Sequence, residues 1–246
     1  MSDHELAAEL AARAGSLLLS VRDELTGAEA SLLRQEGDRR SQELLDAELR
    51  RARPADAVLS EEAADDHRRL DTDRVWIVDP LDGTREFSEP PRVDWAVHVA
   101  LWQGGELVAG AVALPGRQRT VSTLEPPPSP TPGNGHRRMV VSRTRPPALV
   151  QVLARPLEAE LVPMGSAGAK AMAVVLGEAD IYLHAGGQYE WDSAAPVAVA
   201  MAAGLHASRI DGSPLRYNQA DPLLPDVLIC RPELAEEVLS AVSACS

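Results

Sequence analysis

The stretch Trp76–Thr84, WIVDPLDGT, constrains this chain more than any other part of its sequence. Residues 75–78 are all apolar, which is typical of a buried strand, yet they are followed by Asp79 and then by Asp82. Pro80 cannot extend a central strand, and the residue before a proline is held extended, so we expect the strand to stop at Asp79. Buried carboxylates are unfavourable unless they are paired or bind a cation. The motif therefore predicts a turn in which two acids converge.

Further acids stand where the pattern predicts the end of a strand or the start of a helix. They are Glu61, Glu62, Asp192 and Asp38. A turn and a helix cap would explain an isolated Asp-Pro-x-Asp-Gly, but so many acids at element ends exceed what turns require. Hard cations such as Mg²⁺ take carboxylate and carbonyl oxygens, and no Cys and His cluster points to zinc. We interpret His98, in an alternating strand, as a packed residue.

Charge and composition limit the partners. A net charge of −13 argues against a nucleic acid polymer, which would need a basic stripe, but not against a small anionic substrate held through cations. No apolar run is long enough to span a bilayer, and MSDHELAAEL is too polar for a secretory signal, so we expect no membrane partner. Cys230 and Cys245 lack metal-ligand spacing, which indicates a reducing, cytoplasmic location without disulfides.

The periodicity predicts helices and strands in two halves. Helices are expected over residues 4–25, 38–53, 147–154, 167–176, 192–203 and 232–243. Strands are expected at 58–59, 75–78, 93–102, 106–114, 139–142, 180–184 and 227–230, with Gly104-Gly105 joining one hairpin. The proline-dense segment LEPPPSPTPGNG predicts a linker over 126–135. We therefore expect an α+β half over 1–125, which carries the acidic loop, and an α/β half over 136–246, which carries the substrate pocket.

Three blocks of this sequence, SEE, WIVDPLDGT and EWDSAA, resemble the inositol monophosphatase superfamily of Mg²⁺-dependent, lithium-sensitive phosphatases. The blocks occur in the family's order and cover nearly the whole chain. The resemblance implies a layered α-β-α-β-α sandwich and hydrolysis of a phosphate monoester by a metal-activated water. Within the superfamily, VLSEE, DPLDGTREF, SRTRPP and GSAGAK resemble the CysQ-type 3'(2'),5'-bisphosphate nucleotidases. These remove the 3'-phosphate of 3'-phosphoadenosine 5'-phosphate, or of its sulfated form, in sulfate assimilation.

The resemblance also implies a site with two or three Mg²⁺ ions. Its ligands would be Glu61, Asp79, the Leu81 carbonyl, Asp82 and Asp192. Thr84, together with Glu61 or Asp38, would orient the attacking water, and the amides of Gly83 and Thr84 would hold phosphate oxygens. The helix around Asp38 reads EGDRRSQ where the family usually has Ala-Asp-x-x-Ala, and the loop from 26 to 37 before it is short.

The substrate pocket is expected around the GSAGAK segment. Lys170 is the only lysine of the chain, and a lysine at this place in bisphosphate nucleotidases faces the second phosphate; the alternative is a solvated helix lysine. Ser166 would lie near the ribose or a phosphate. Arg143 and Arg145 are candidates to bind the same phosphate through two hydrogen bonds each, or are a solvated pair. Glu190 resembles the acid that binds substrate hydroxyls, or is a surface residue.

The expected function is that of a phosphomonoester hydrolase acting on a small phosphorylated substrate. Residues expected to touch that substrate are Leu81, Asp82, Gly83, Thr84, Arg143, Ser166, Lys170, Glu190 and Asp192. An alternative within the class is an inositol-1-phosphatase or fructose-1,6-bisphosphatase, and one outside it is a non-catalytic nucleotide- or metal-binding regulator. Tyr189 and Trp191 are expected to pack rather than to stack on a base. The superfamily resemblance also makes a homodimer an expectation.

Overall fold

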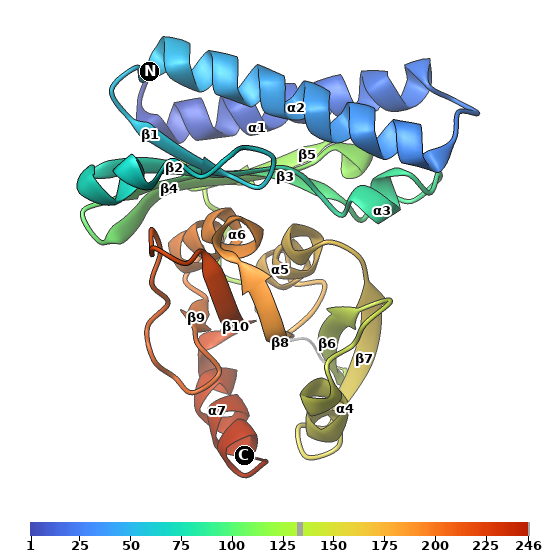
Figure 1. Cartoon of the computed structure of the whole chain (residues 1–246). Helices are drawn as coiled ribbons and strands as arrows, with labels where there is room; N and C mark the ends of the chain where they lie inside the picture. Colours follow the sequence, from blue (N-terminus) through green and yellow to red (C-terminus); the bar gives the residue numbers. More distant parts are fainter. Residues whose placement is uncertain (132–134, 246) are drawn as a thin grey trace.

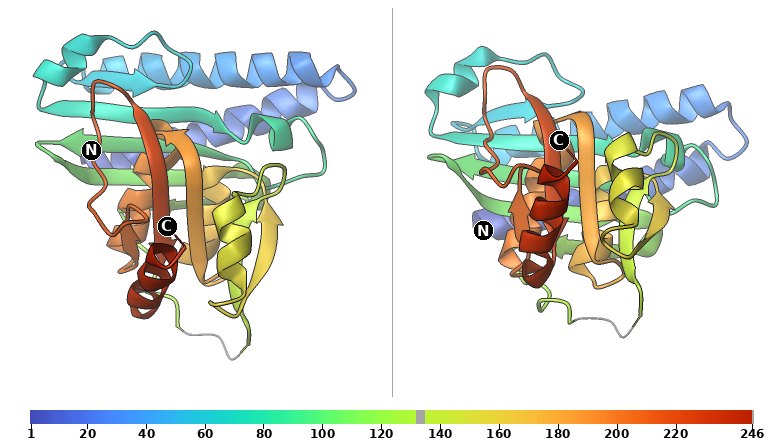
Figure 2. Two further views of the ribbon diagram at one scale, coloured as in Figure 1. Left: turned by 60° about the horizontal axis from the view of Figure 1, so that its bottom comes forward. Right: turned by 90° about the horizontal axis from the view of Figure 1, so that it is seen from below.

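The computed structural model describes residues 1–131 and 135–245. Its layers alternate helix, sheet, helix, sheet and helix (Figure 1), as the resemblance implied. The outer helices on the first sheet are α1 (Asp3–Glu24) and α2 (Ala30–Ala52). The middle layer consists of α5 (Ala167–Val175) and α6 (Glu190–Ala202). Helices α4 (Ala148–Ala154) and α7 (Ala235–Ser243) lie side by side on the outer face of the second sheet (Figure 2).

The first sheet has the order β1-β2-β3-β4-β5, in which β1 and β2 are parallel and the other neighbours antiparallel. Its strands are β1 (Ala57–Ser60), β2 (Arg74–Asp82), β3 (Ala96–Gln103), β4 (Glu106–Leu114) and β5 (Arg119–Ser122). Short helices follow strands β1, β2 and β4: η1 (His67–Asp71), α3 (Thr84–Phe87) and η2 (Pro115–Arg117). Strands β3 and β4 form the hairpin that Gly104-Gly105 predicted, with positive φ at both glycines.

The second sheet has the order β7-β6-β8-β10-β9, with β6 parallel to β7 and β8, and β10 antiparallel to β8 and β9. Its strands are β6 (Arg137–Ser142), β7 (Ala159–Met164), β8 (Ile181–Tyr189), β9 (His206–Ser208) and β10 (Leu223–Cys230). A short helix, η3 (Pro232–Leu234), leads into α7. Strands β7 and β9, like β5 of the first sheet, were not among the predicted strands.

Both faces of the first sheet are covered, which explains the uninterrupted apolar run in β2. Val75 and Ile77 pack into the core shared with α5 and α6, while Trp76 and Val78 pack into the core under α1 and α2. All four side chains are at most 1% exposed. The middle helices contact both sheets, so one core joins the strands on either side of the proline-rich segment.

The prediction that a helix begins at Asp38 is wrong. Helix α2 begins at Ala30, so the segment 26–37 is mostly helical rather than a loop. Gly37 lies inside the helix. A Cβ at this position would come within 2.7 Å of Phe87 and 2.9 Å of Leu81, so only glycine allows the helix to approach them this closely. The glycine therefore marks a close approach of α2 to its neighbours and not a helix end.

The prediction that the strand stops at Asp79 is also wrong. Strand β2 continues to Asp82, with Asp79 opposite His98 and Asp82 opposite Ala96 on β3. The register shifts between the two aspartates, so the intervening residues form a bulge. Pro80 lies in this bulge, where its missing N–H removes no ladder hydrogen bond.

Several other expectations concern the whole chain. Of the predicted linker 126–135, residues 132–134 lie outside the described residues, and residues 126–131 belong to no helix or strand. The division into two halves at this segment stays a prediction. Cys230 is buried and Cys245 exposed, and both are free, as expected. No helix in the described part of the chain is long and apolar enough to cross a membrane.

Candidate active site and metal centre

Three aspartates meet between the first sheet and the middle helices. Asp79, Asp82 and Asp192 each offer a carboxylate oxygen, and these oxygens all lie within 4.8 Å of one another. The bulge at the end of β2 supplies the first two, and the first turn of α6 supplies the third. The structure thus brings together two segments that are far apart in the sequence, as the predicted ligand set requires.

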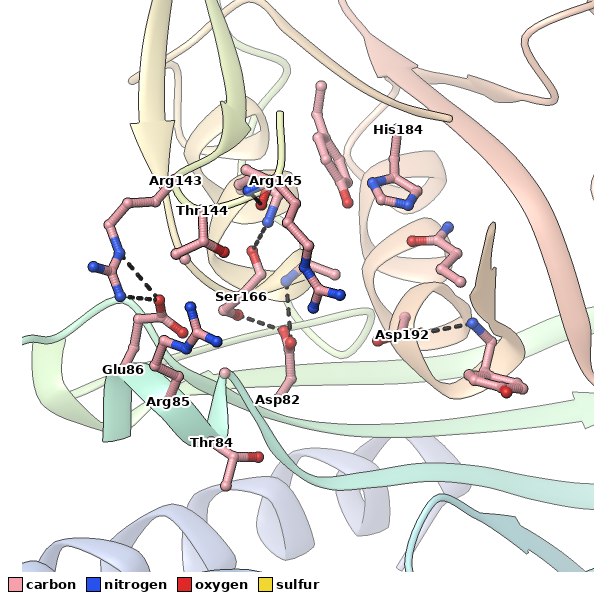
Figure 3. A pocket seen from close by; sticks show the side chains of 18 of the residues that line it. Asp82, Thr84, Arg85, Glu86, Arg143, Thr144, Arg145, Ser166, His184 and Asp192 are labelled. Atoms are coloured by element: carbon pink, nitrogen blue, oxygen red, sulfur yellow. Dashed lines mark hydrogen bonds and ion pairs between the residues drawn. The ribbon is translucent and has the colours of Figure 1, made fainter. Parts of the chain in front are cut away.

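Asp79 and Asp192 have raised pKa values. Burial, followed by the charges of Glu61 and Asp82, raises the pKa of Asp79 well above its usual value. Burial and the charge of Asp82 raise the pKa of Asp192 to about 6. One hydrogen bond opposes each shift, from the Leu81 amide to Asp79 at 3.0 Å and from the Tyr189 amide to Asp192 at 2.6 Å (Figure 3). A cation between these oxygens would relieve both penalties, so the carboxylate set fits a hard divalent metal.

Asp82 has the opposite character. Its Oδ1 accepts from the Ala167 amide at 3.1 Å, and its Oδ2 accepts from the Gly168 amide at 2.6 Å and from the Ser166 hydroxyl. Burial favours a higher pKa, but the contact with His98 and the positive charges nearby lower the pKa of Asp82 to about 2. Asp82 is therefore ionised before any cation arrives, and its charge lies at the amino-terminal end of α5, where a helix favours an anion.

The other two predicted catalytic acids, Asp38 and Glu61, do not belong to the cluster of three aspartates and do not line the cavity beside it. Asp38 is half-buried in α2; burial and the charge of Glu62 raise its pKa to about 7, while a hydrogen bond with Thr84 opposes the shift. Glu61 follows β1, and its pKa is also raised to about 7, by desolvation first and by the charges of Asp192 and Asp82 second. The side chain of Glu61 is solvent-exposed, so water screens its charge more than that of the buried aspartates.

The loop after β2 is held by its own hydrogen bonds. The Thr84 hydroxyl donates to the Leu81 carbonyl at 3.1 Å. Gly83 adopts a left-handed conformation with a φ of 84° and a Cβ there would lie 3.0 Å from Ser166. A larger residue at Gly83 would push apart the loop and the start of α5, so the glycine of the motif is required by packing as well as by backbone conformation.

A cavity of about 440 Å³ opens beside the three aspartates. Most of the predicted substrate-binding residues line it: Asp82, Gly83, Thr84, Arg143, Ser166, Lys170 and Asp192, together with Arg145. Figure 3 shows Asp82 at the end of β2, Ser166 before α5, Arg143 and Arg145 after β6, and Asp192 in the first turn of α6 around this cavity. Side chains that the sequence reasoning did not single out also line the cavity, namely Tyr182, His184 and Gln188.

Lys170 is buried, so the alternative of a solvated helix lysine is wrong. Only 6% of the residue is exposed, and its ammonium donates to the Ser166 carbonyl at 2.5 Å. It also lies 5.4 Å from the centre of the Tyr182 ring. Burial lowers the pKa of Lys170, while the charge of Asp82 opposes the shift. An ammonium at the wall of the cavity can face an anion there.

Arg143 is held by carboxylates in this structure. Its guanidinium bonds to Glu86 at 2.7 Å and to Glu89 at 2.9 Å, so it is not a freely solvated arginine (Figure 3). Arg145 is exposed at the edge of the cavity. Phosphate binding by either arginine stays a prediction.

Glu190 is almost fully buried, which excludes the surface alternative. Its carboxylate accepts from the amides of Asn218 at 2.6 Å and Gln219 at 2.8 Å, and it is not among the residues that line the cavity. Its contact with a substrate hydroxyl stays a prediction. Tyr189 and Trp191 stack on each other with ring centres 4.7 Å apart, but Tyr189 is 45% exposed and lines the cavity. That they pack rather than stack on a base stays a prediction.

His98 is packed and fully buried, as predicted, but its contact with Asp82 was missed. The contact arises because the bulge in β2 brings both aspartates onto the face of β3 that carries His98. Local alternation in the sequence does not reveal register across a bulge, so no sequence signal could have identified this neighbour.

The layered fold and a cluster of three aspartates that could hold a metal ion define the class of proteins to which this chain belongs. The sequence model of the inositol monophosphatase family matches residues 2–246, and the chain belongs to this family. A 3'-phosphoadenosine 5'-phosphate phosphatase of Mycobacterium bovis is 55% identical over 94% of this chain and 89% of its own length. The protein of the same name from Mycobacterium leprae is 52% identical over 98% of this chain and 94% of its own length.

A solved structure supports the same assignment. The crystal structure of CysQ from Bacteroides thetaiotaomicron, described as a bacterial member of the inositol monophosphatase family, matches with a TM-score of 0.75 and 28% identity. The match covers 92% of this chain and 96% of the other.

Proposed function

We propose that this protein is a Mg²⁺-dependent phosphatase that removes the 3'-phosphate of 3'-phosphoadenosine 5'-phosphate to give AMP and phosphate. The observation that carries the proposal is the cluster of Asp79, Asp82 and Asp192, with oxygens within 4.8 Å, beside a cavity that contains a buried lysine. The names of the 52–55% identical relatives support this substrate. The sulfated nucleotide has the same 3'-phosphate and is a second expected substrate.

The acidic side chains would hold the cations. Asp79, Asp82 and Asp192, with Glu61 and the Leu81 carbonyl, are the proposed ligands for two or three Mg²⁺ ions. When bound, Mg²⁺ neutralises the phosphate dianion, lowers the pKa of a bound water and stabilises the leaving oxygen. Hydrolysis then requires no side-chain nucleophile.

Water activation would fall to Thr84 and its acidic neighbours. The pKa of Asp38, whose carboxyl lies near Thr84, is raised to about 7, and Glu61 has a similarly raised pKa. A carboxylate with a pKa near the working pH is suited to accept a proton from an attacking water. The amides of Gly83 and Thr84 would hold phosphate oxygens at the start of α3.

Substrate choice would depend on Lys170. Its ammonium lies at the wall of the cavity, 6% exposed, where it would face the 5'-phosphate of a bisphosphate. Inositol-1-phosphate has no second phosphate for this lysine to neutralise. Ser166, Arg143 and Glu190 are the other proposed substrate contacts. Lithium sensitivity, a role in sulfate assimilation, a cytoplasmic location and a homodimer remain predictions from the family resemblance.

The test is phosphate release from three candidate substrates. With Mg²⁺ present, the protein should hydrolyse 3'-phosphoadenosine 5'-phosphate with a higher kcat/KM than inositol-1-phosphate or fructose-1,6-bisphosphate. Chelation of the metal should abolish release from all of them, and lithium should inhibit it. Near-equal kcat/KM values would remove the nucleotide preference. No release from any substrate would favour the non-catalytic regulator.

A further inference from the structure

The side chain of His98 joins two parts of the aspartate centre. It is fully buried on β3. Its Nδ1 lies 3.0 Å from the Trp191 carbonyl oxygen and, since a carbonyl only accepts, Nδ1 must carry a proton and donate. Its Nε2 lies 3.2 Å from Asp82 Oδ2; as an imidazolium the ring carries a second proton there and forms a close ion pair, whose alignment is too poor for a hydrogen bond. Trp191 directly precedes Asp192, so one ring contacts Asp82 and the turn that carries Asp192.

The space around the ring is closed by α5. A Cβ on Gly168 would come within 2.0 Å of His98 Nε2, so only glycine permits this approach of the helix. The same residue donates its amide to Asp82 at 2.6 Å. The carboxylate of Asp82 is therefore enclosed by His98 from β3 and by backbone amides from α5.

We propose that His98 is a positioning residue, which sets the separation of Asp82 and Asp192 and so prepares the centre to bind Mg²⁺. This inference rests on the metal site of the proposed function, because His98 would act on the metal only through Asp82 and Asp192, which bind it. The two acids come from different layers, and their separation would otherwise depend on the packing of β2 against α6. Outer contacts that orient metal ligands typically change metal affinity by about 10- to 100-fold when removed.

The test compares substitutions that remove the two contacts of the ring together or separately. His98→Leu removes both at similar volume. His98→Asn keeps a donor at the Nδ1 position, toward Trp191, and His98→Gln keeps one at the Nε2 position, toward Asp82. Val99→Ala is the matched control, because Val99 is equally buried on β3 but packs into the core under α1 and α2.

Calorimetric titration of the metal-free proteins with Mg²⁺ measures the expected effect without turnover. His98→Leu should weaken Mg²⁺ binding by about 10-fold or more, and Asn and Gln should each recover part of the loss. Val99→Ala should lower the melting temperature of the metal-free protein and leave the Mg²⁺ dissociation constant within about twofold. The rise in melting temperature on adding Mg²⁺ should shrink in His98→Leu alone.

Several results would overturn the inference. These are unchanged Mg²⁺ affinity in His98→Leu, an equal loss in Val99→Ala, or Asn and Gln variants as weak as Leu. If His98→Leu does not fold, the Asn and Gln variants carry the same comparison. A wild-type protein that takes up no Mg²⁺ overturns the metal centre and this inference together. If the wild type binds Mg²⁺ but releases no phosphate, the proposed function fails while the affinities still test His98.

Discussion

At the scale of single residues, the aspartates of the centre divide into two kinds. Asp82 has a pKa of about 2 and is ionised without metal, because α5 and His98 stabilise its charge. Asp79 and Asp192 have raised pKa values and hold protons more readily. A cation arriving at the site would therefore meet the charge of Asp82 first and release protons from the other two.

Asp79→Asn and Asp82→Asn should each lower kcat by about 10²-fold or more, because each change removes a charge that holds the cations. The measurement is phosphate release from 3'-phosphoadenosine 5'-phosphate at saturating Mg²⁺. Asp221→Asn is a suitable control, since Asp221 does not line the cavity and its carboxylate accepts from the nearby Leu223 amide. A near wild-type rate for either site variant would contradict the ligand assignment.

Lys170→Ala should raise KM for the nucleotide bisphosphate by about 10-fold and leave KM for inositol-1-phosphate unchanged, because only the bisphosphate has a second phosphate to neutralise. Steady-state kinetics on both substrates checks this. Lys170→Arg tests whether charge alone suffices, since guanidinium is larger and differently shaped. Equal effects on both substrates would show that the lysine supports the fold rather than selectivity.

The WIVDPLDGT and EWDSAA blocks were enough to predict Asp79, Asp82 and Asp192 as ligand candidates, because each block has a characteristic residue order. They could not predict the environment of each carboxylate. The difference between Asp79 and Asp82 depends on amides from Ala167 and Gly168, which are more than eighty residues away and meet Asp82 only through tertiary packing. Such contacts leave no local pattern in the sequence.

At the scale of elements, the position of α5 depends on Gly168. Gly168→Ala would place a Cβ 2.0 Å from His98 Nε2, so the ring or the helix must move. We expect a loss of about 1–3 kcal/mol in the free energy of unfolding, as for other overpacked sites, and weaker Mg²⁺ binding. Urea unfolding and calorimetry measure the two effects.

The control is Gly135→Ala, because none of the described residues lies within 4 Å of a Cβ at Gly135. This control should stay within about 0.5 kcal/mol of the wild type. A Gly168→Ala protein with wild-type stability and Mg²⁺ affinity would show that α5 is free to shift without disturbing Asp82.

Helices and strands with strong periodicity could be predicted, and those without it could not. Strand β7 is only partly buried and contains Pro163, so its apolar alternation is weak. Strand β9 is three residues long. The start of α2 was missed because Gly37 looks like a helix boundary, whereas the helix needs it for close packing against Phe87.

At the scale of the whole molecule, the acidic centre couples stability to pH and to metal. The raised pKa values of Asp38, Asp79 and Asp192 mean that the metal-free folded protein binds more protons than the unfolded chain between about pH 4 and pH 7. The free energy of unfolding should therefore fall as pH rises through this window. Asp82 acts in the opposite sense, since its contribution is lost only as pH falls from about 4 toward 2.

Bound Mg²⁺ should reverse the trend, because it favours the ionised carboxylates in the folded state. Urea unfolding in chelator should show decreasing stability from about pH 5 to pH 7.5, and saturating Mg²⁺ should remove or invert that decrease. Identical pH profiles with chelator and with Mg²⁺ would contradict the coupling.

The layered arrangement could be predicted only through the resemblance, because alternating helices and strands do not reveal that α5 and α6 lie between two sheets (Figure 1). This arrangement explains why the acids come from both sides of the proline-rich segment. The loop after β2 belongs to the first sheet, and Asp192 begins a helix packed against that sheet.

The most direct test of the account is anomalous diffraction from crystals of this protein grown with Mn²⁺. We expect a strong peak within coordination distance of Asp79, Asp82 and Asp192, in the space between β2 and the start of α6. Crystals in which these three carboxylates lack a Mn²⁺ peak, while the protein is otherwise folded as described, would contradict the central claim.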